Sequence, residues 1–343
     1  MKPINRIAMA LAGGLGMLAA HGAFAQTTRT MSSWVPPTHH LTKVVLQGWA
    51  NEVEKATAGR IKFQMLPKAP AAPPGTFDAV KDDLVDLSYV TASYTPARHI
   101  VTKLGELPGA GATAEINSVA YSRIYWKYLD KVGEYKGVKL IGVFTHGPGQ
   151  MFNTKHPIKT VADIQGLKIR TGGGVADDMA KALGASAFVK PAPESYELLS
   201  SGVADGVFFP LESIVSFKLD GVVKYATLIP GGFYSSSFGF FMNQDKWNKL
   251  PKQDQAIIDK LGYEHLARLA GKSWDAADKI GMQGLEKAGV QIDRASPQLQ
   301  KEIDERSGPV VQAWIKDVGA KGVDGAMVYK AFHEELKRVA AGT

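Results

Sequence analysis

The segment DIQGLKIRTGGG places one arginine, Arg170, at the end of a short alternating run and three glycines directly after it. Arginine presents a planar fork that binds a carboxylate through two parallel hydrogen bonds, and it stays charged in a partly dry site. Glycines between a strand and a helix can also bring backbone N–H groups up to an anion. The segment therefore predicts an anion contact. Its partner is either a ligand or a neighbouring Asp or Glu of the chain.

A phosphate is the first ligand to compare with this segment. A dinucleotide fingerprint needs G-x-G-x-x-G/A, but here Gly172 and Gly174 are followed by Asp177, whose carboxylate would repel an anion. The chain also contains no G-x-x-x-x-G-K-[ST] loop. The sequence therefore argues against a phosphate or nucleotide, and we predict no cofactor.

Residues that could catalyse a reaction do not occur in a catalytic pattern. The chain has no G-x-S-x-G, no H-E-x-x-H and no cysteine. Histidines that pack or cap at the start of a helix explain the pair His39-His40 better than a metal site does. The adjacent carboxylates at 82–83 and 177–178 would not face each other on a helix, which favours solvated or capping roles. We predict no catalytic residue and no metal ligand, and a protein that is not an enzyme.

Short strands alternate with helices in two blocks of the chain. The segments RIKFQMLP, LSYVT and KLIGVFT read as strands before the Gly- and Pro-containing stretch that begins at His146, and GLKIR, AFVKPA and ADGVFFP read as strands after it. The strand SSSFGFFMN is expected to return to the first block. Helical spacing from Pro251 to Ala288 exceeds the ~25 residues usual for one helix, which favours a strut across both blocks.

These elements predict an α/β protein of two lobes with a central cleft, hinge crossings and a long helix that spans both lobes. We expect lobe 1 at 26–147, with 237–276 returning to it, and lobe 2 at 148–236, with 277–343. Ligands of open α/β sheets bind outside the carboxyl ends of the strands. Arg170 lies at such an end.

The first 25 residues have the composition of a secretory signal peptide. Lys2 and Arg6 precede an apolar run at 7–20, and Ala23-Phe24-Ala25 is a small-x-small cleavage site. The alternative, a membrane anchor, would need an apolar run of ~20 residues. We therefore expect cleavage near Ala25 and a periplasmic protein. Without Lys2 and Arg6, the chain keeps 38 basic and 33 acidic residues, which are scattered and predict no nucleic-acid partner.

The order of several segments resembles the solute-binding proteins of TRAP (tripartite ATP-independent periplasmic) transporters, of the DctP type. The segments are WVPPTHHLTKVVLQGWANEVEKATAGRIKFQMLP, SYTPARH, FNTKHPIKTVADIQGLKIRTGG, ALGASAFVKPAPESYELLSSGVADG and FFMNQDKWNKLPKQDQAIID. The resemblance implies two α/β lobes with a long shared helix and a cleft that closes over an organic acid. In this family the arginine of a K-[IL]-R element binds the substrate carboxylate, and here that arginine is Arg170. The glycines at 172–174 then form a sharp turn that leaves room beside it.

Departures from the family pattern bear on the ligand. Many members have an asparagine in a D-G-x-x-N-P element where this chain has Phe209, and a sialic-acid-binding branch has a second arginine where this chain has Gln150. PKAPAAPPGTF replaces a common Q-L-G loop. Because unpaired polar groups in a closed cleft are costly, one guanidinium with an aromatic wall suits a monocarboxylate with a flat or apolar body. An aromatic or 2-oxo acid is the best candidate.

Further candidates to contact the ligand lie at expected strand ends or cleft loops, although ordinary core packing explains each of them equally well. They are Trp34, Tyr94, His146, Phe233 and Tyr234. With Arg170, Phe209 and Gln150 they make eight predicted ligand contacts. The resemblance also implies a monomer that delivers its ligand to the large and small integral membrane subunits of a TRAP transporter. Two alternatives remain: a binding protein of the ABC-associated or sensory kind, and an exported α/β enzyme.

Overall fold

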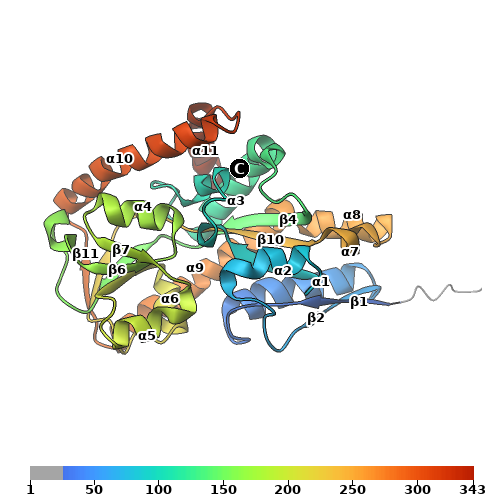
Figure 1. Cartoon of the computed structure of the whole chain (residues 1–343), viewed down its shortest axis with the longest axis horizontal. Helices are drawn as coiled ribbons and strands as arrows, with labels where there is room; N and C mark the ends of the chain where they lie inside the picture. The colour runs from blue at the N-terminus through green and yellow to red at the C-terminus, as the bar shows by residue number, and fades with distance from the viewer. Residues whose placement is uncertain (1–25) are drawn as a thin grey trace, which may run out of the picture.

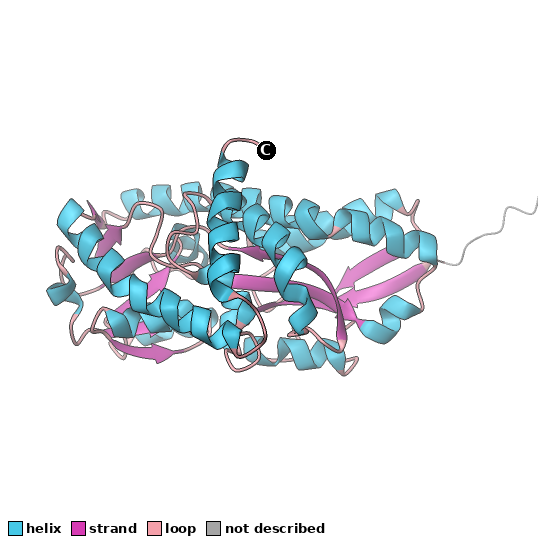
Figure 2. Cartoon of the chain, turned by 90° about the horizontal axis from the view of Figure 1, so that it is seen from above, coloured by secondary structure: helices cyan, strands magenta, loops and turns pink. Residues whose placement is uncertain are grey.

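The computed structural model describes residues 26–343 and contains two β-sheets flanked by helices. In Figure 1 the sheet that begins with β1 lies on the right, and the sheet with β6 and β7 lies on the left. Figure 2 shows the same two groups of strands from above, with helices packed around each. We call the parts built on these sheets the first lobe and the second lobe. The predicted signal peptide and its cleavage site near Ala25 lie outside the described residues.

The sheet of the first lobe has five strands in the order β2-β1-β3-β10-β4. They are β1 (Thr27–Met31), β2 (Ile61–Met65), β3 (Leu87–Thr91), β4 (Val138–Thr145) and β10 (Ser237–Asn243). β10 runs antiparallel to both of its neighbours, β3 and β4. The prediction that SSSFGFFMN returns to the first block is therefore confirmed. All of β10 is buried, which accounts for its apolar run.

The sheet of the second lobe has six strands in the order β11-β9-β5-β8-β6-β7. They are β5 (Gln150–Asn153), β6 (Lys168–Thr171), β7 (Ser186–Val189), β8 (Gly206–Phe209), β9 (Tyr225–Leu228) and β11 (Gln291–Arg294). β6 and β8 are parallel neighbours, with Arg170 opposite Val207. Arg170 and Phe209 therefore come to the same edge of the sheet.

Helices cover both sheets (Figure 1). In the first lobe they are α1 (Gln47–Ala56), which continues a π-helical turn at Leu41–Leu46, α2 (Thr76–Lys81), the 3-10 helix η4 (Val101–Glu106), α3 (Ala114–Ile124) and α7 (Gln244–Asn248). In the second lobe they are α4 (Gly174–Ala182), α5 (Ser195–Ser200) and α6 (Leu211–Ser216).

The long helix predicted from Pro251 to Ala288 is interrupted. α8 spans Lys252–Leu261 and α9 spans Tyr263–Lys287. A side chain at Gly262 would lie 2.6 Å from the carbonyl oxygen of Ile141 in β4, and Tyr263 takes a φ of 47°. The chain therefore turns where it meets the sheet. α9 alone forms the strut, because it packs on α3 and β4 of the first lobe and on α6 of the second.

Two helices complete the chain. α10 (Pro297–Gly319) packs on α4, and α11 (Gly325–Ala340) packs on α3 and α10. The predicted boundaries of the lobes remain a prediction, since α11 packs both on α3 of the first lobe and on α10. Within residues 26–343, no helix combines the length and the apolar character that crossing a membrane requires.

Candidate functional site

A cavity lies between the lobes, where β3, β6 and β8 end. Eight of the 19 residues that line it are aromatic, namely Trp34, Tyr94, Phe208, Phe209, Phe217, Tyr234, Phe238 and Trp274. Both lobes contribute to this wall, so a molecule in the cavity would be enclosed by their closure.

Arg170 is the cation of the cavity wall. Its side chain is 1% exposed, and its Nε and Nη2 both donate to the carbonyl oxygen of Lys190, Nε at 2.8 Å. Burial lowers the pKa of Arg170, whereas Tyr94 and Tyr234 act to raise it. Among residues 26–343, no carboxylate oxygen lies within 4.0 Å of the guanidinium. The internal Asp or Glu partner left open by the sequence is therefore absent there, and the charge is free to pair with an anionic ligand.

Phe209 provides the surface on which the guanidinium rests. The Cζ atom of Arg170 lies 4.5 Å from the centroid of the Phe209 ring. The Phe209 ring is ordered in turn, since it stacks on the ring of Phe217 at 5.7 Å and 15°. A cation over a desolvated aromatic face gains about 2 kcal/mol. Phe209 therefore holds the arginine in place and gives the cavity an apolar wall beside this guanidinium.

Polar atoms in the cavity wall could bind a second group of the ligand. Trp34 Nε1, Thr91 Oγ1 and Trp274 Nε1 are buried without a hydrogen-bond partner in the described part of the chain. The Tyr94 hydroxyl accepts from the backbone N–H of Ala192 at 2.9 Å. Burial raises the pKa of Tyr94 despite the opposing charge of Arg170, so its proton remains for donation. A hydroxyl or carbonyl group on the ligand would find partners here.

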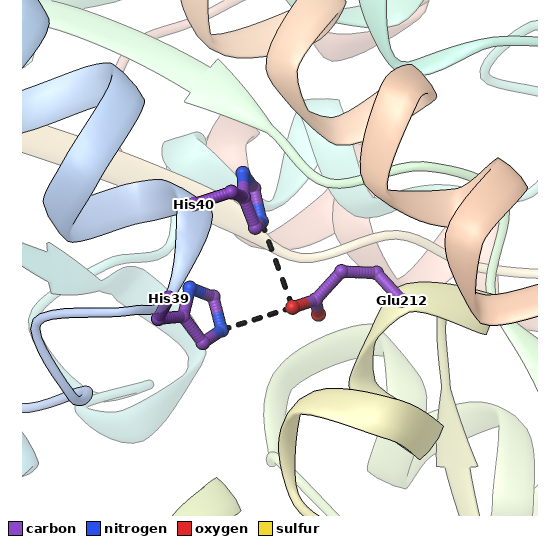
Figure 3. Close-up of side chains that lie close together, drawn as sticks. All are labelled: His39, His40 and Glu212. Carbon is purple, nitrogen blue, oxygen red and sulfur yellow. Dashed lines mark ion pairs between the residues drawn. The ribbon is translucent and has the colours of Figure 1, made fainter. Parts of the chain in front are cut away.

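Two histidines and a glutamate join the lobes at the side of the cavity (Figure 3). His39 and His40 precede the first helix, and Glu212 lies in α6 of the second lobe. The Nε2 atoms of His39 and His40 lie 3.1 and 3.8 Å from Glu212 Oε1. Burial acts to raise the pKa of Glu212, but the hydrogen bond from His39, the proximity of both histidines and the hydrogen bond from Ser216 hold it at about 2. Glu212 is therefore ionised and satisfied at neutral pH.

The same three side chains have a composition that could bind a metal ion, since their ligand atoms lie within 4.8 Å of one another. The hydrogen bonds argue for a different role. The backbone N–H of Leu41 donates to His39 Nδ1 at 3.2 Å, which leaves the ring proton on Nε2, where it faces Glu212. A nitrogen that carries a proton cannot ligate a metal. The arrangement is that of a hydrogen-bonded contact between the lobes.

The cavity gathers six of the eight residues predicted to contact a ligand. They are Trp34, Tyr94, His146, Arg170, Phe209 and Tyr234. The ring of His146 lies between those of Tyr234 and Trp274, at 5.5 and 5.7 Å. Burial lowers the pKa of His146 to about 4, so this ring is neutral at pH 7. Contact of these six with a ligand stays a prediction.

The other two predicted residues, Gln150 and Phe233, do not line this cavity. Gln150 exchanges hydrogen bonds with the backbone of Ile229 and lines a separate cavity beside Asp278. Phe233 packs edge-on against Phe208 at 4.8 Å and is 1% exposed. The rings of Phe233 and Tyr234 pack against each other at 5.1 Å, and only Tyr234 reaches the cavity wall.

Several residues of the site were not identified from the sequence. The sequence predicts that His39 packs or caps at the start of a helix, but His39 lines the cavity. Phe217, Phe238 and Trp274 also line it. Spacing could have indicated Trp274, because it lies on the apolar face of the strut helix, which must pass between the lobes. The sequence offers no signal for Glu212, whose partners lie in a distant part of the chain.

Asp278 on the strut helix gives a prediction about pH. Its Oδ1 accepts from the backbone N–H of Glu212 at 2.8 Å, and burial raises its pKa to about 8. A carboxyl group with a raised folded-state pKa stabilises the protein below its unfolded pKa, and that stability is lost as the pH rises towards 8. Asp278→Asn keeps an acceptor oxygen and removes the titration. We expect the free energy of unfolding of Asp278→Asn, relative to the wild type, to rise by about 4 kcal/mol between pH 5 and pH 8.

Urea unfolding of both proteins across this pH range measures the difference. The exposed Asp317 provides the control, because Asp317→Asn makes the same chemical change on α10, where the side chain is not buried. A difference between Asp278→Asn and the wild type that stays constant from pH 5 to pH 8 would contradict the prediction.

The chain is similar to known proteins in both sequence and fold. Residues 31–317 match the model of a family described as bacterial extracellular solute-binding protein, family 7 (DctP). A TRAP periplasmic solute-binding protein from Bordetella bronchiseptica, solved with bound (R)- and (S)-mandelate, is 48% identical. That similarity covers 91% of this chain and 99% of the other, with a TM-score of 0.89.

Two further solved structures are similar over the same extent. A marine metagenome TRAP solute-binding protein in complex with 3-hydroxybenzoate is 30% identical, with a TM-score of 0.86, and covers 92% of this chain and 99% of its own. A TRAP solute-binding protein from Rhodoferax ferrireducens with copurified benzoate is 25% identical, with a TM-score of 0.86 and the same coverage.

Proposed function

The chain belongs to family 7 of the bacterial extracellular solute-binding proteins, the DctP family of TRAP transporters, and from this premise we propose that it captures an aromatic monocarboxylate. Its family captures solutes outside the cytoplasm, and organic acids are the ligands in the similar structures described above. In our proposal the carboxylate binds Arg170, and the aromatic body occupies the cavity between the lobes. The predicted residues Trp34, Tyr94, His146, Phe209 and Tyr234 would enclose it.

The observation that carries this proposal is the state of Arg170. It is buried, it has no acidic partner among the described residues, and it rests on the ring of Phe209. A buried and unpaired charge is unfavourable unless an opposite charge arrives. One carboxylate supplies that charge, and a second carboxylate would have to be buried without a cation. A single acidic group on a flat apolar body therefore fits better than a dicarboxylate or a sugar acid.

The ligands of the similar structures support this choice. Mandelate, 3-hydroxybenzoate and benzoate each carry one carboxylate on an aromatic body. Two of them also carry a hydroxyl group, for which the unpartnered atoms Trp34 Nε1, Thr91 Oγ1 and Trp274 Nε1 are suitable partners. We therefore place hydroxylated aromatic acids first among the candidates, and a 2-oxo acid such as phenylpyruvate after them.

Other parts of the proposal rest on the family alone. We propose that residues 1–25 direct export and are removed near Ala25, and that the mature protein delivers its ligand to the large and small membrane subunits of a TRAP transporter. Capture without chemical change is part of the same proposal. Recovery of the bound acid unaltered after prolonged incubation would support it, and appearance of a product would contradict it.

A thermal-shift panel tests the ligand class. The panel contains (R)- and (S)-mandelate, benzoate, 3-hydroxybenzoate, phenylpyruvate, succinate and galactonate, with mandelamide and benzamide as uncharged controls. A ligand at about 100 times its Kd stabilises the folded state by about 2.7 kcal/mol. We expect aromatic monocarboxylates to raise the melting temperature and their amides to leave it unchanged. A larger shift with succinate or galactonate, or no shift with any aromatic acid, would contradict the proposal.

A further inference from the structure

We propose that Glu106 of the first lobe docks on the N-terminus of helix α4 in the second lobe, and that this docking controls how long the ligand is retained. Gly173 and Gly174 provide the space in which the Glu106 carboxylate lies. The inference rests on the proposed function, since it concerns release of the captured acid. It assigns the glycines at 172–174, which follow Arg170 in the chain, a role in contact between the lobes. The anion at this helix start is a side chain of the other lobe.

The hydrogen bonds of Glu106 join the two lobes through one carboxylate. Glu106 ends η4 and is 1% exposed. Its Oε1 accepts from the hydroxyl of Ser237 at 2.8 Å and from the backbone N–H of the same residue at 3.2 Å. Its Oε2 accepts from the backbone N–H of Val175 at 3.1 Å. Ser237 begins β10 in the first lobe, whereas Val175 lies in the first turn of α4 in the second.

Helix α4 has no cap of its own at this end. Its N-cap residue is Gly173, which has no side chain to accept a hydrogen bond. The first N–H groups of a helix have no partner within the helix, and they carry a partial positive charge that favours an anion. Glu106 supplies the acceptor, and it does so only while the lobes are together. Burial raises the pKa of its carboxyl group, whereas the hydrogen bonds from Ser237 and Val175 act to lower it and so favour the charged form. The contact is therefore a cap that is made on closure.

The glycines allow the lobes to come close enough for this cap. Gly173 and Gly174 have φ values of 83° and 58°, a region that side chains rarely adopt. A Cβ atom on Gly174 would lie 2.3 Å from Glu106 Oε2 and 2.8 Å from Ser93 Cβ, and one on Gly173 would lie 2.5 Å from the Ser93 carbonyl oxygen. Any side chain here would push the first lobe away from the helix.

This docking site is continuous with the ligand cavity. Arg170 and Gly173 lie on one short stretch at the end of β6, and the first lobe meets this stretch with the neighbouring residues Ser93 and Tyr94. A second contact joins the same two helices, because Lys103 of η4 pairs with Asp178 of α4 at 3.1 Å. Closure over a carboxylate at Arg170 and docking of Glu106 therefore bring the same surfaces together. We infer that Glu106 and Gly174 are positioning residues for capture, although neither lines the cavity.

Dissociation kinetics with (R)-mandelate as the probe test this inference. We expect Gly174→Ala to release mandelate at least tenfold faster than the wild type and to bind it at a rate within threefold of the wild type. Glu106→Gln keeps an acceptor oxygen without the charge, so its release should be intermediate. Gly202→Ala is the matched control, because Gly202 has a φ of 74° in the same lobe and a Cβ atom there would have no neighbour within 4 Å. This control should match the wild type in release.

Distances between two spin labels measure the closure of the lobes independently of folding. The chain has no cysteine, so one label in each lobe, at Lys55→Cys and Val203→Cys, gives a clean pair of exposed positions. We expect the closed population to fall in Gly174→Ala and in Glu106→Gln, with or without mandelate, while Gly202→Ala keeps it. Equal release rates and equal distances in Gly174→Ala and Gly202→Ala would overturn the inference. Failure of the wild type to bind mandelate or any acid of the panel would overturn the proposed function instead, and the distances without ligand would still decide the docking.

Discussion

Replacement of Arg170 by alanine is expected to lower the affinity for an aromatic monocarboxylate by at least about 30-fold, which corresponds to about 2 kcal/mol. The reason is the environment of the side chain. In our proposal the ligand's carboxylate pairs in the wild type with a buried guanidinium that has no acidic partner among residues 26–343. In the variant the same carboxylate would be buried without a cation. Calorimetric titration of both proteins with the acid that stabilises the wild type most measures the loss.

Folding must be separated from binding in this experiment, because Arg170 also donates to the carbonyl oxygen of Lys190. Arg60→Ala provides a matched control. Arg60 pairs with Asp254 at 2.7 Å in the first lobe, away from the cavity, so its loss should reduce stability and leave affinity within threefold of the wild type. A loss of less than threefold in Arg170→Ala, measured at a temperature where it is folded, would show that Arg170 is not the anchor.

Replacement of Phe209 by leucine is the second change with a large expected effect, a loss of about tenfold in affinity for aromatic acids. Leucine keeps an apolar side chain but removes the ring that supports the guanidinium at 4.5 Å and stacks on Phe217. A desolvated cation–π contact contributes about 2 kcal/mol, and an aromatic pair about 0.5–1.5 kcal/mol. Part of this energy is lost equally from the free protein, so about 1.4 kcal/mol, or tenfold, is expected in binding.

Phe233→Leu is the control for this variant. Phe233 is a buried aromatic residue of the same region, but it packs against Phe208 and does not line the cavity. Both leucine variants should lose similar stability on urea unfolding, and only Phe209→Leu should lose affinity. Equal affinities of the two variants would indicate that the ring of Phe209 serves packing alone.

The architecture could be predicted from the sequence because it depends on local patterns. Short apolar runs, the return of SSSFGFFMN and the strut helix all follow from periodicity, and the structure contains each of them. The break at Gly262 could not be predicted in the same way. It arises where the backbone passes close to Ile141, and that contact exists only once α9 packs on β4.

The site could be predicted in part. Arg170 and Phe209 occupy strand ends in a recognisable motif, and their positions on β6 and β8 bring them together. Gln150 and Phe233 do not line the cavity, because the orientation of a side chain does not follow from its position in the chain alone. The role of Glu212 and that of Glu106 depend on partners from the other lobe. Such contacts leave no local pattern.

The glycines at 172–174 show what a sequence motif reveals without the structure. Asp177, which the sequence predicts to be unsuited to a nucleotide site, has a local role in the structure: it accepts from the Thr171 hydroxyl and pairs with Lys181. The expectation that the glycines leave room beside the arginine is incomplete. In the structure Gly173 and Gly174 also make room for Ser93 and Glu106.

The central claim is that Arg170 binds the carboxylate of the ligand, and a titration of the acid and its carboxamide into the wild type and Arg170→Ala tests it most directly. The four affinities form a cycle that isolates the energy of this one contact. We predict that the wild type binds mandelate at least about 30-fold more tightly than mandelamide, and that Arg170→Ala binds the two within threefold of each other. If Arg170→Ala still preferred the acid as strongly as the wild type does, the carboxylate would bind elsewhere and the claim would be wrong.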